Sequence, residues 1–289
     1  MTKEKVPFYF SIDFEDFHYD TLRALNVKNP SSKPNAMIES YKKIKELSVK
    51  YFHNKKMTFF VTGILAEKMP SLISEIFNDG HEIGCHYNYH DNINQSNRKD
   101  FAYNLDEAIE RISNATGTKP IGFRAPNFAI DPENYWAYEE LSKRFVYDSS
   151  YKTSKNINDL KMQKDFTYGN TYLKEFFIFG MPTFTNSFRI RSGGTFMRLF
   201  SANTIIKSMF ESFRHGHVPL IYMHPYELTL NHEFWISWNK LKSLPLGRKI
   251  YIWLRQMQWT HLGHKTVEKK IQNICQYFEH QGPMKYLVE

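Results

Sequence analysis

The chain has few cysteines and no long hydrophobic run. Cys85 and Cys275 are the two cysteines among 289 residues, which excludes a disulfide framework. No stretch approaches the ~18–20 apolar residues needed to cross a bilayer, and the first five residues lead into an apolar run without a secretory leader. We therefore expect a globular, cytoplasmic protein, whose hydrophobic content of 42% suffices for a substantial core.

Acidic residues are scarce near the C-terminus. Residues 240–289 contain nine Lys/Arg against three Asp/Glu, and the segment 248–255 is both basic and aromatic. Such a segment could face an anionic membrane surface, a pyrophosphate-linked glycan or a nucleotide sugar, and so hold the protein at the inner face of a membrane. The simpler interpretation is a solvated helix face whose aromatic residues pack on the domain. We expect no nucleic acid partner, because no nucleic-acid-binding motif accompanies the charge.

Short apolar runs alternate with longer amphipathic stretches along the chain. This alternation predicts repeated βα units around a mainly parallel sheet or barrel, which is an α/β fold. The expected strands lie near residues 8–13, 57–61, 82–86, 120–124, 145–148 and 218–223. The expected helices lie near residues 36–53, 65–78, 98–115, 132–143 and 202–214.

Two regions depart from this alternation. Residues 150–200 predict an insertion with strands at the sheet edge or over the site. Residues 231–289 are rich in Trp and Tyr and follow no Pro/Gly/Ser linker, so we expect a helical extension packed on the same domain as residues 1–230.

Candidate metal ligands and acids stand where the predicted strands end. His86 and His90 are spaced to bind one ion, and the acidic segment 13–16 ends the first apolar run. Arg124 and His224 each follow a later apolar run. The carboxyl ends of parallel strands are where α/β folds place catalytic groups, so we expect these side chains to meet. Hydrolysis assisted by a metal is the leading hypothesis.

Taken together in order, these motifs resemble those of the polysaccharide deacetylases, the NodB-homology domain of carbohydrate esterase family 4. The resemblance spans roughly residues 6–225, and it implies a distorted (β/α) barrel. The motifs are Asp13-Phe14-Glu15-Asp16, His86-Tyr87-Asn88-Tyr89-His90, Arg124-Ala125-Pro126-Asn127-Phe128, Tyr147-Asp148-Ser149-Ser150 and Tyr222-Met223-His224-Pro225. Gly80–Gly84, Gly193–Arg198 and Glu227 resemble the branch that has an Asp-x-Glu-Asp first motif and a final His-Pro-x-Glu.

The resemblance implies a role for each catalytic candidate. Asp13 would be the general base, and Arg124 would pair with it and orient it. His224 would protonate the leaving amine, while Asp148 would hold the imidazole ring. The backbone N–H of Asn127 is a candidate donor to the oxyanion.

The resemblance also implies a divalent metal ion, for which we expect Zn²⁺. His86, His90 and one carboxylate would bind it. The common family has adjacent aspartates in the first motif, so either Glu15 or Asp16 could supply that carboxylate here. We favour Glu15, because residues two apart on a strand face the same side and Glu15 is two residues from Asp13.

The expected function is the metal-dependent removal of an N-acetyl group from an amino sugar, releasing acetate. The partner would be an acetylated amino-sugar substrate that is a lipid-linked or nucleotide-linked precursor of a surface glycan. The alternatives are a C–N hydrolase that acts on a non-sugar amide or imide, and a catalytically inactive glycan-binding or membrane-binding protein. Asp13, Arg124 and His224 together argue against the inactive protein, because binding alone needs no base, no orienting group and no acid.

Overall fold

The computed structural model describes residues 4–28, 30–130, 132–152, 166–168, 171–183 and 188–289. In this part of the chain no helix is both long and apolar enough to cross a membrane. The strands are β1 (Val6–Phe14), β2 (Thr58–Val61), β3 (Glu82–Cys85), β4 (Gly122–Phe123), β5 (Tyr147–Asp148), β6 (Phe166–Tyr168), β7 (Thr171–Glu175), β8 (Gly180–Pro182), β9 (Arg189–Arg191), β10 (Leu220–Met223) and β11 (Phe278–His280).

The α-helices lie between these strands and after β10. They are α1 (Phe17–Ala24), α2 (Pro34–Tyr51), α3 (Gly63–Lys68), α4 (Pro70–Asn78), α5 (Arg98–Thr116), α6 (Trp136–Ser142), α7 (Gly194–Leu199), α8 (Ala202–Arg214), α9 (Pro225–Leu228), α10 (Leu246–Gln256) and α11 (Val267–Ile274). Short 3₁₀ turns connect several of them.

One large sheet organises the molecule. Its strand order is β10-β1-β2-β3-β4-β5-β7-β6, and every neighbouring pair is parallel except β6 with β7. The carboxyl ends of β1, β2, β3, β4, β5 and β10 consequently point the same way. The α/β fold that the alternation predicted is confirmed.

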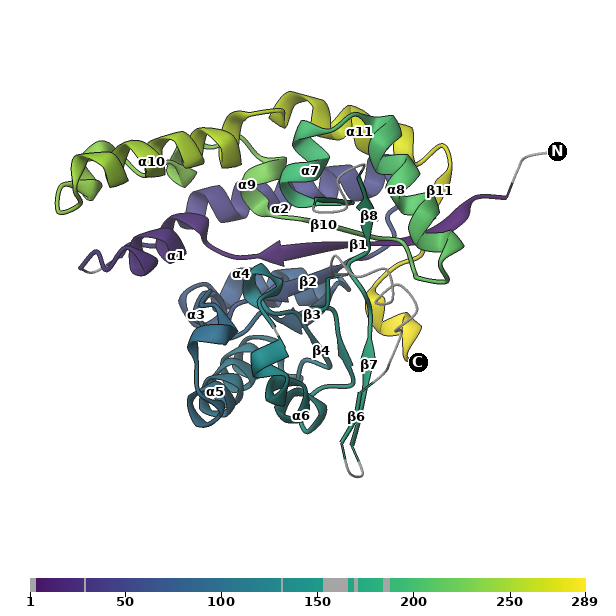
Figure 1. Ribbon diagram of the computed structural model, residues 1–289, viewed down its shortest axis with the longest axis horizontal. Helices are drawn as coiled ribbons and strands as arrows, with labels where there is room; N and C mark the ends of the chain where they lie inside the picture. Colours follow the sequence, from purple (N-terminus) through teal and green to yellow (C-terminus); the bar gives the residue numbers. More distant parts are fainter. Residues whose placement is uncertain (1–3, 29, 131, 153–165, 169–170, 184–187) are drawn as a thin grey trace.

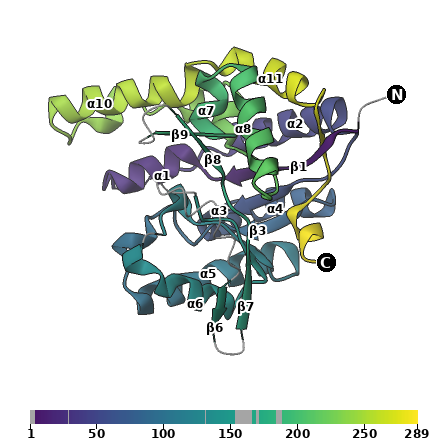
Figure 2. The same ribbon diagram turned by 45° about the vertical axis from the view of Figure 1, so that its right-hand side comes forward.

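The first strand is central because it pairs on both sides. Its carboxyl half pairs with β10 and β2, and its amino half pairs with β11. Its last seven residues are all buried, as expected for a parallel strand covered on both faces. Figures 1 and 2 show α2, α8 and α11 on one side of β1, and α3 to α6 on the other side.

Two differences from the predicted elements have local causes. The helix predicted over 65–78 is broken into α3 and α4 at Met69, because Pro70 disfavours the helical conformation of the residue before it. Helix α1 was not predicted. Asp16 begins it by accepting a hydrogen bond from the N–H of Tyr19.

The inserted region and the C-terminal region both contribute strands. In the insertion, β7 extends the edge of the sheet beside β5, while β8 and β9 form a separate antiparallel pair. Residues 153–165, 169–170 and 184–187 lie outside the described residues. The C-terminal region is mainly helical, and its strand β11 pairs with the amino half of β1.

Candidate active site

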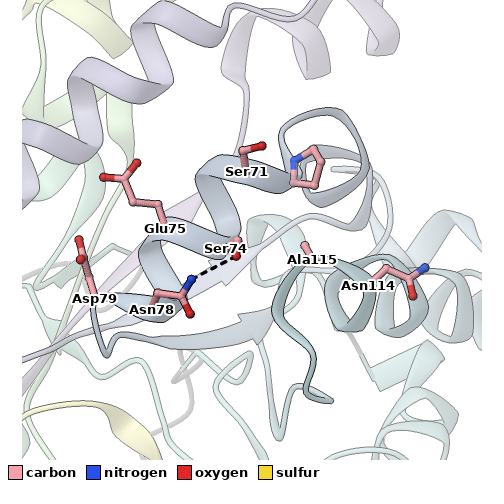
Figure 3. Close-up of a pocket in the computed structure, with 8 residues that line it drawn as sticks. Ser71, Ser74, Glu75, Asn78, Asp79, Asn114 and Ala115 are labelled. Carbon is pink, nitrogen blue, oxygen red and sulfur yellow. Dashed lines mark hydrogen bonds between the residues drawn. The ribbon is translucent and has the colours of Figure 1, made fainter.

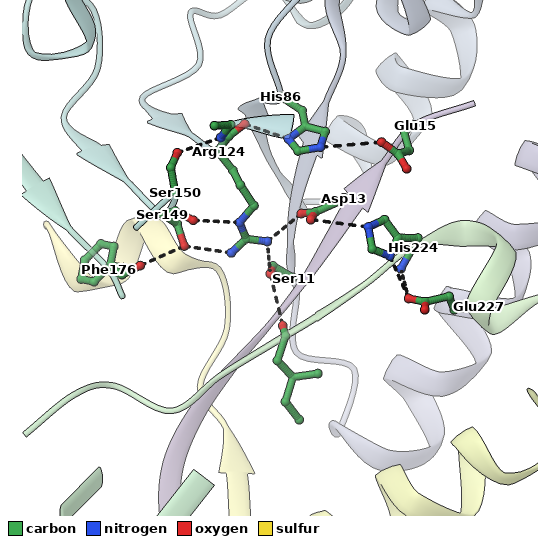
Figure 4. A network of polar contacts seen from close by, with 12 residues as sticks. Ser11, Asp13, Glu15, His86, Arg124, Ser149, Ser150, Phe176, His224 and Glu227 are labelled. Atoms are coloured by element: carbon green, nitrogen blue, oxygen red, sulfur yellow. Dashed lines mark hydrogen bonds and ion pairs between the residues drawn. The ribbon is translucent and has the colours of Figure 1, made fainter. Parts of the chain in front are cut away.

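The carboxyl ends of the central strands border one cleft of about 560 Å³. Asp13 and Glu15 reach it from the end of β1, His86 and His90 from the segment after β3, and His224 from the end of β10. The structure therefore brings together side chains that are more than 200 residues apart in the sequence. Figure 4 shows most of this group and the contacts that connect it.

Glu15, His86 and His90 form a group that could hold a metal ion. One ligand atom from each lies within 4.8 Å of the other two. Glu15 Oε2 is 2.5 Å from His90 Nε2 and 3.8 Å from His86 Nε2, and it is buried without a hydrogen bond of regular geometry. Three electron-pair donors that converge in this way are stabilised by a shared cation, so the residues fit a divalent metal ion.

The backbone after β3 explains how the two imidazoles converge. Tyr87 has a φ of 66°, in the left-handed region that non-glycine residues rarely adopt, and this turns the chain directly after His86. The Tyr87 ring is buried and stacks on Phe101. His86 Nδ1 lies 2.8 Å from the carbonyl oxygen of Arg124 and donates to it, which leaves Nε2 free to face Glu15.

Burial and neighbouring charges set the protonation states of Glu15, His86 and His90. Burial lowers the pKa of His86 to about 4, so this imidazole is neutral and able to ligate a metal. Burial raises the pKa of Glu15, but the neighbouring His90 outweighs burial and holds the pKa at about 2. Burial works against the charged form of His90 as well, yet Glu15 raises its pKa.

Asp16 does not join the metal-binding group. Its Oδ1 accepts from the N–H of Tyr19, and its Oδ2 accepts from Ser32 Oγ at 2.6 Å and from the N–H of Lys33 at 2.9 Å. Both oxygens are therefore used to cap α1 and to fix the following loop. This corrects the expectation that either acid could serve, and it agrees with the strand-face argument that favoured Glu15.

Asp13 is held by a buried arginine. Asp13 Oδ1 accepts a hydrogen bond from an Arg124 nitrogen at 2.6 Å, and the same nitrogen donates to Ser11 Oγ at 2.7 Å. The Arg124 guanidinium is fully buried, packs 4.2 Å from the centre of the Phe60 ring and donates to both oxygens of Ser149. Asp13 Oδ2 remains directed to the cleft, 3.9 Å from His224 Nε2.

His224 is held by Glu227, a residue to which the sequence analysis gave no role. Glu227 Oε2 lies 2.8 Å from His224 Nδ1 and accepts from the His224 backbone N–H, and Glu227 Oε1 accepts from Arg198 at 2.9 Å. Burial lowers the pKa of His224, but the charge of Glu227 prevails and raises it to about 9. The spacing is a capping box that begins α9, with Pro225 at the first helical position, so the sequence did carry a signal.

The expectation that Asp148 holds His224 is wrong. Asp148 is fully buried, and its two oxygens accept from the N–H and the hydroxyl of Ser150. Ser150 Oγ in turn accepts from the N–H of Ala125 at 2.8 Å. Asp148 therefore supports the strand end that carries Arg124, and burial raises its pKa.

Two further groups line the cleft. The N–H of Asn127, the candidate oxyanion donor, makes no hydrogen bond within the described part of the chain, and Asn127 has a φ of 55°. Asp20 on α1 was not anticipated, because α1 was not. Both of its carboxylate oxygens are buried without a hydrogen bond to a described residue, and burial raises its pKa to about 8.

A second hollow of about 600 Å³ lies between α4 and the end of α5 (Figure 3). It contains two carboxylates, Glu75 and Asp79, and both are paired with Lys45. Asp79 also accepts from the hydroxyl of Tyr41. Its lining has no histidine and no converging donors. The cleft at the strand ends is therefore the candidate active site.

Two histidines and a carboxylate at the carboxyl edge of a parallel sheet, next to Asp13 and His224, are the donor types of a metal-hydrolase site. Residues 42–146 match the family model described as polysaccharide deacetylase. This match spans about a third of the chain, and over this segment the chain is similar to the polysaccharide deacetylases. The matched segment contains His86, His90 and Arg124, whereas Asp13 and His224 lie outside it and are placed by the structure.

Sequence relatives cover part of the chain. A peptidoglycan-N-acetylglucosamine deacetylase of Bacillus cereus is 34% identical over 89 residues, which are 30% of this chain and 32% of that protein. A peptidoglycan deacetylase-like protein of Gibberella zeae is 34% identical over 95 residues, which are 33% of this chain and 28% of that protein. The chain thus matches about a third of the length of these curated relatives.

The likeness in fold extends further. The crystal structure of a polysaccharide deacetylase homologue from Mycobacterium smegmatis superposes with a TM-score of 0.52 at 16% identity. The alignment covers 94% of this chain and 92% of that one. It confirms the expected distorted barrel over nearly the whole length.

Proposed function

We propose that the protein is a metal-dependent deacetylase that hydrolyses the N-acetyl group of an amino sugar and releases acetate. The observation that carries the proposal is the convergence, in one cleft, of Glu15, His86 and His90 with an acid–base pair formed by Asp13 and His224. The match of residues 42–146 to the polysaccharide deacetylase model supports the reaction class, and the names of the sequence relatives support an acetylated carbohydrate as substrate.

The two residues of the acid–base pair take different roles in the proposed reaction. Asp13 Oδ1 accepts from Arg124, which leaves Oδ2 directed to the cleft, where it can accept a proton from an attacking water. His224 keeps its proton up to a pH of about 9, and Glu227 holds Nδ1, so Nε2 faces the cleft as the donor to the leaving amine. The Asn127 N–H would stabilise the oxyanion.

Glu15, His86 and His90 would hold the ion, and Zn²⁺ suits two imidazoles and one carboxylate that leave coordination positions open. When bound, such an ion supplies Lewis acidity to the acyl group and to the attacking water. The neutral state of His86 and the ionised state of Glu15 are those that ligation requires.

We infer that the acetylated sugar is a lipid-linked or nucleotide-linked precursor of a surface glycan, and that the protein acts in the cytoplasm at the inner face of a membrane. Arg248 and Arg255 of α10 line the same cleft as the acid–base pair, and cations at that position suit a phosphate or pyrophosphate next to the sugar. The basic C-terminal region supports contact with an anionic membrane surface.

The test is acetate release by the zinc-loaded protein across a panel of acetylated nucleotide sugars and lipid-linked glycans. Asp13→Asn is the inactive comparison, and Glu82→Gln is a matched control, because Glu82 is a buried acid at the opposite end of β3. We expect release by wild type and Glu82→Gln and little release by Asp13→Asn. Equal acetate release by wild type and Asp13→Asn would remove the proposed mechanism. No release from any amino sugar would favour the non-sugar hydrolase or the binding protein.

A further inference from the structure

Helix α10 carries its apolar stripe on the side that faces solvent. Leu246, Ile250, Trp253, Leu254 and Met257 recur at the i, i+4, i+7, i+8 and i+11 spacing of one helix face. Their side chains are between 38% and 65% exposed. A surface helix normally turns such a stripe toward the core, so this arrangement needs a partner surface.

The opposite face of α10 is firmly attached, so the stripe cannot simply roll inward. Ile252 is buried against a small cluster that includes Leu22 of α1 and Leu241. Gln256 is also buried, and its side-chain amide exchanges two hydrogen bonds with the backbone of Ile236. Figures 1 and 2 show α10 beside α1, at the end of the molecule toward which β1 points.

The segment around α10 contains basic residues but no acidic ones. Residues 234–267 contain six Lys/Arg and no Asp or Glu. Lys249 lies on the helix itself, and Lys240 and Lys242 precede it. An apolar stripe flanked by cations is the pattern of helices that lie in the interface of a membrane with anionic lipids.

We propose that the solvent-facing stripe of α10 docks the protein on a bilayer that contains anionic lipids. A second copy of the chain is disfavoured as the occupant, because a two-fold contact would bring two acid-free basic segments together. A bilayer surface satisfies both features, since its acyl region accepts the stripe and its headgroups neutralise the cations.

The docking would bear on catalysis through the position of the cleft. Arg248, Ile252 and Arg255 of the same helix line the cleft, so a bound membrane would lie next to its entrance. A lipid-linked substrate would then reach the active site without leaving the bilayer. This last step rests on the proposed deacetylase activity, whereas the docking itself does not.

The experiment is vesicle flotation of the full chain with phosphatidylcholine alone and with phosphatidylcholine containing phosphatidylglycerol. The variant is the triple substitution Leu246→Ser, Ile250→Ser and Leu254→Ser, none of which lines the cleft. The matched control places serine at Val49 of α2 and Tyr103 of α5, which are similarly exposed but lie on other faces.

Wild type and control should float with the anionic vesicles, and the triple variant should lose at least about tenfold in affinity. Circular dichroism and acetate release from a soluble substrate should stay unchanged in the triple variant, which separates failure of docking from failure of the enzyme. Equal flotation of wild type and triple variant, or equal binding to both vesicle types, would overturn the proposal. So would a wild-type dimer in light scattering that the triple substitution dissociates.

Discussion

His81 and Glu82, a histidine and a buried acid, lie at the amino end of β3. The cleft at the carboxyl ends of the strands contains the same two residue types. At the amino end these groups are hydrogen-bonded to other parts of the protein. Glu82 accepts from the hydroxyls of Thr58 and Tyr147 and from the N–H of Lys285, and His81 Nδ1 accepts from the N–H of Met57. His280 of β11 is likewise bonded at both nitrogens.

The carboxyl end leaves equivalent groups open. Both oxygens of Asp20 are buried without hydrogen bonds to described residues. Glu15 Oε2 faces the imidazoles of His86 and His90, and His86 is bonded at Nδ1 while its Nε2 faces Glu15. A buried polar atom without a partner is costly, so its persistence indicates a ligand or a reaction. Open bonding capacity, and not burial or residue type, therefore distinguishes the functional end from the structural one.

The largest expected effect is loss of the metal, which should follow substitution of His86 or His90 but not of His81. His86→Ala or His90→Ala removes a ligand, so metal affinity should fall by ~10²-fold or more and acetate release should stop. His81→Ala should keep one equivalent of metal and instead lower the free energy of unfolding by about 1–3 kcal/mol, because the N–H of Met57 loses its acceptor. Elemental analysis and denaturant unfolding measure the two outcomes. Unchanged metal content in both His86 and His90 variants would refute the site.

The second effect concerns Asp13. Asp13→Asn should keep the metal and the fold while lowering kcat by ~10²-fold or more, because an amide cannot accept the proton of the water. The comparison is Glu82→Gln, which changes a buried acid at the other end of the sheet and should leave kcat near wild type. Steady-state acetate release by metal-loaded proteins gives the answer, and near-normal turnover by Asp13→Asn would rule out its role as base.

The third effect distinguishes the neighbouring acids Glu15 and Asp16 by their contributions to metal affinity and to stability. Glu15→Ala should weaken metal binding by ~10–100-fold or more, because it removes a ligand. Asp16→Ala should leave metal affinity intact and cost about 1–2 kcal/mol of stability, since it removes the cap of α1 and the bonds to Ser32 and Lys33. Calorimetric titration with Zn²⁺ and thermal unfolding distinguish the two. A zinc site emptied by Asp16→Ala alone would show that the ligand assignment is inverted.

Sequence-based prediction located the elements whose hydrophobic residues repeat with a clear period over the full length of a strand or helix. The strands near residues 8–13 and 82–86 and the helix near 98–115 are present, because buried parallel strands and long amphipathic helices have distinctive patterns. It failed where tertiary context decides. The strand β11 is three residues long and gains its stability from pairing with β1, and no local pattern marks such a segment.

The candidate site was predictable in its members but not in their pairing. Strand ends and the family resemblance predicted Asp13, His86 and His224, which line one cleft, and Arg124, which is buried behind Asp13. The partner of His224 is Glu227, which the short helix α9 places beside it, and the signal for this was the local capping-box spacing and not the order of the motifs. Asp148 was therefore paired with the wrong neighbour.

The smallest expected effect tests this pairing through pH. A general acid acts while it is protonated, so activity should persist up to a pH of about 9, the pKa of His224, and fall above it. His224→Ala should lower kcat and abolish this alkaline limb. Glu227→Gln keeps the shape of the side chain but removes the charge that contributes most to raising the pKa of His224, so the alkaline limb should move to lower pH.

The control for this last effect is Asp148→Asn, which changes an acid that bonds to Ser150 and has no contact with His224. Its alkaline limb should stay where wild type has it, even if its turnover falls. The measurement is kcat/KM against pH between about 6 and 10 for the metal-loaded proteins. If the alkaline limb of the pH profile moves in Asp148→Asn and stays in place in Glu227→Gln, Asp148 is the partner of His224, as expected from the sequence. The opposite pattern would show that a buried carboxylate three residues downstream sets the working pH range of the acid.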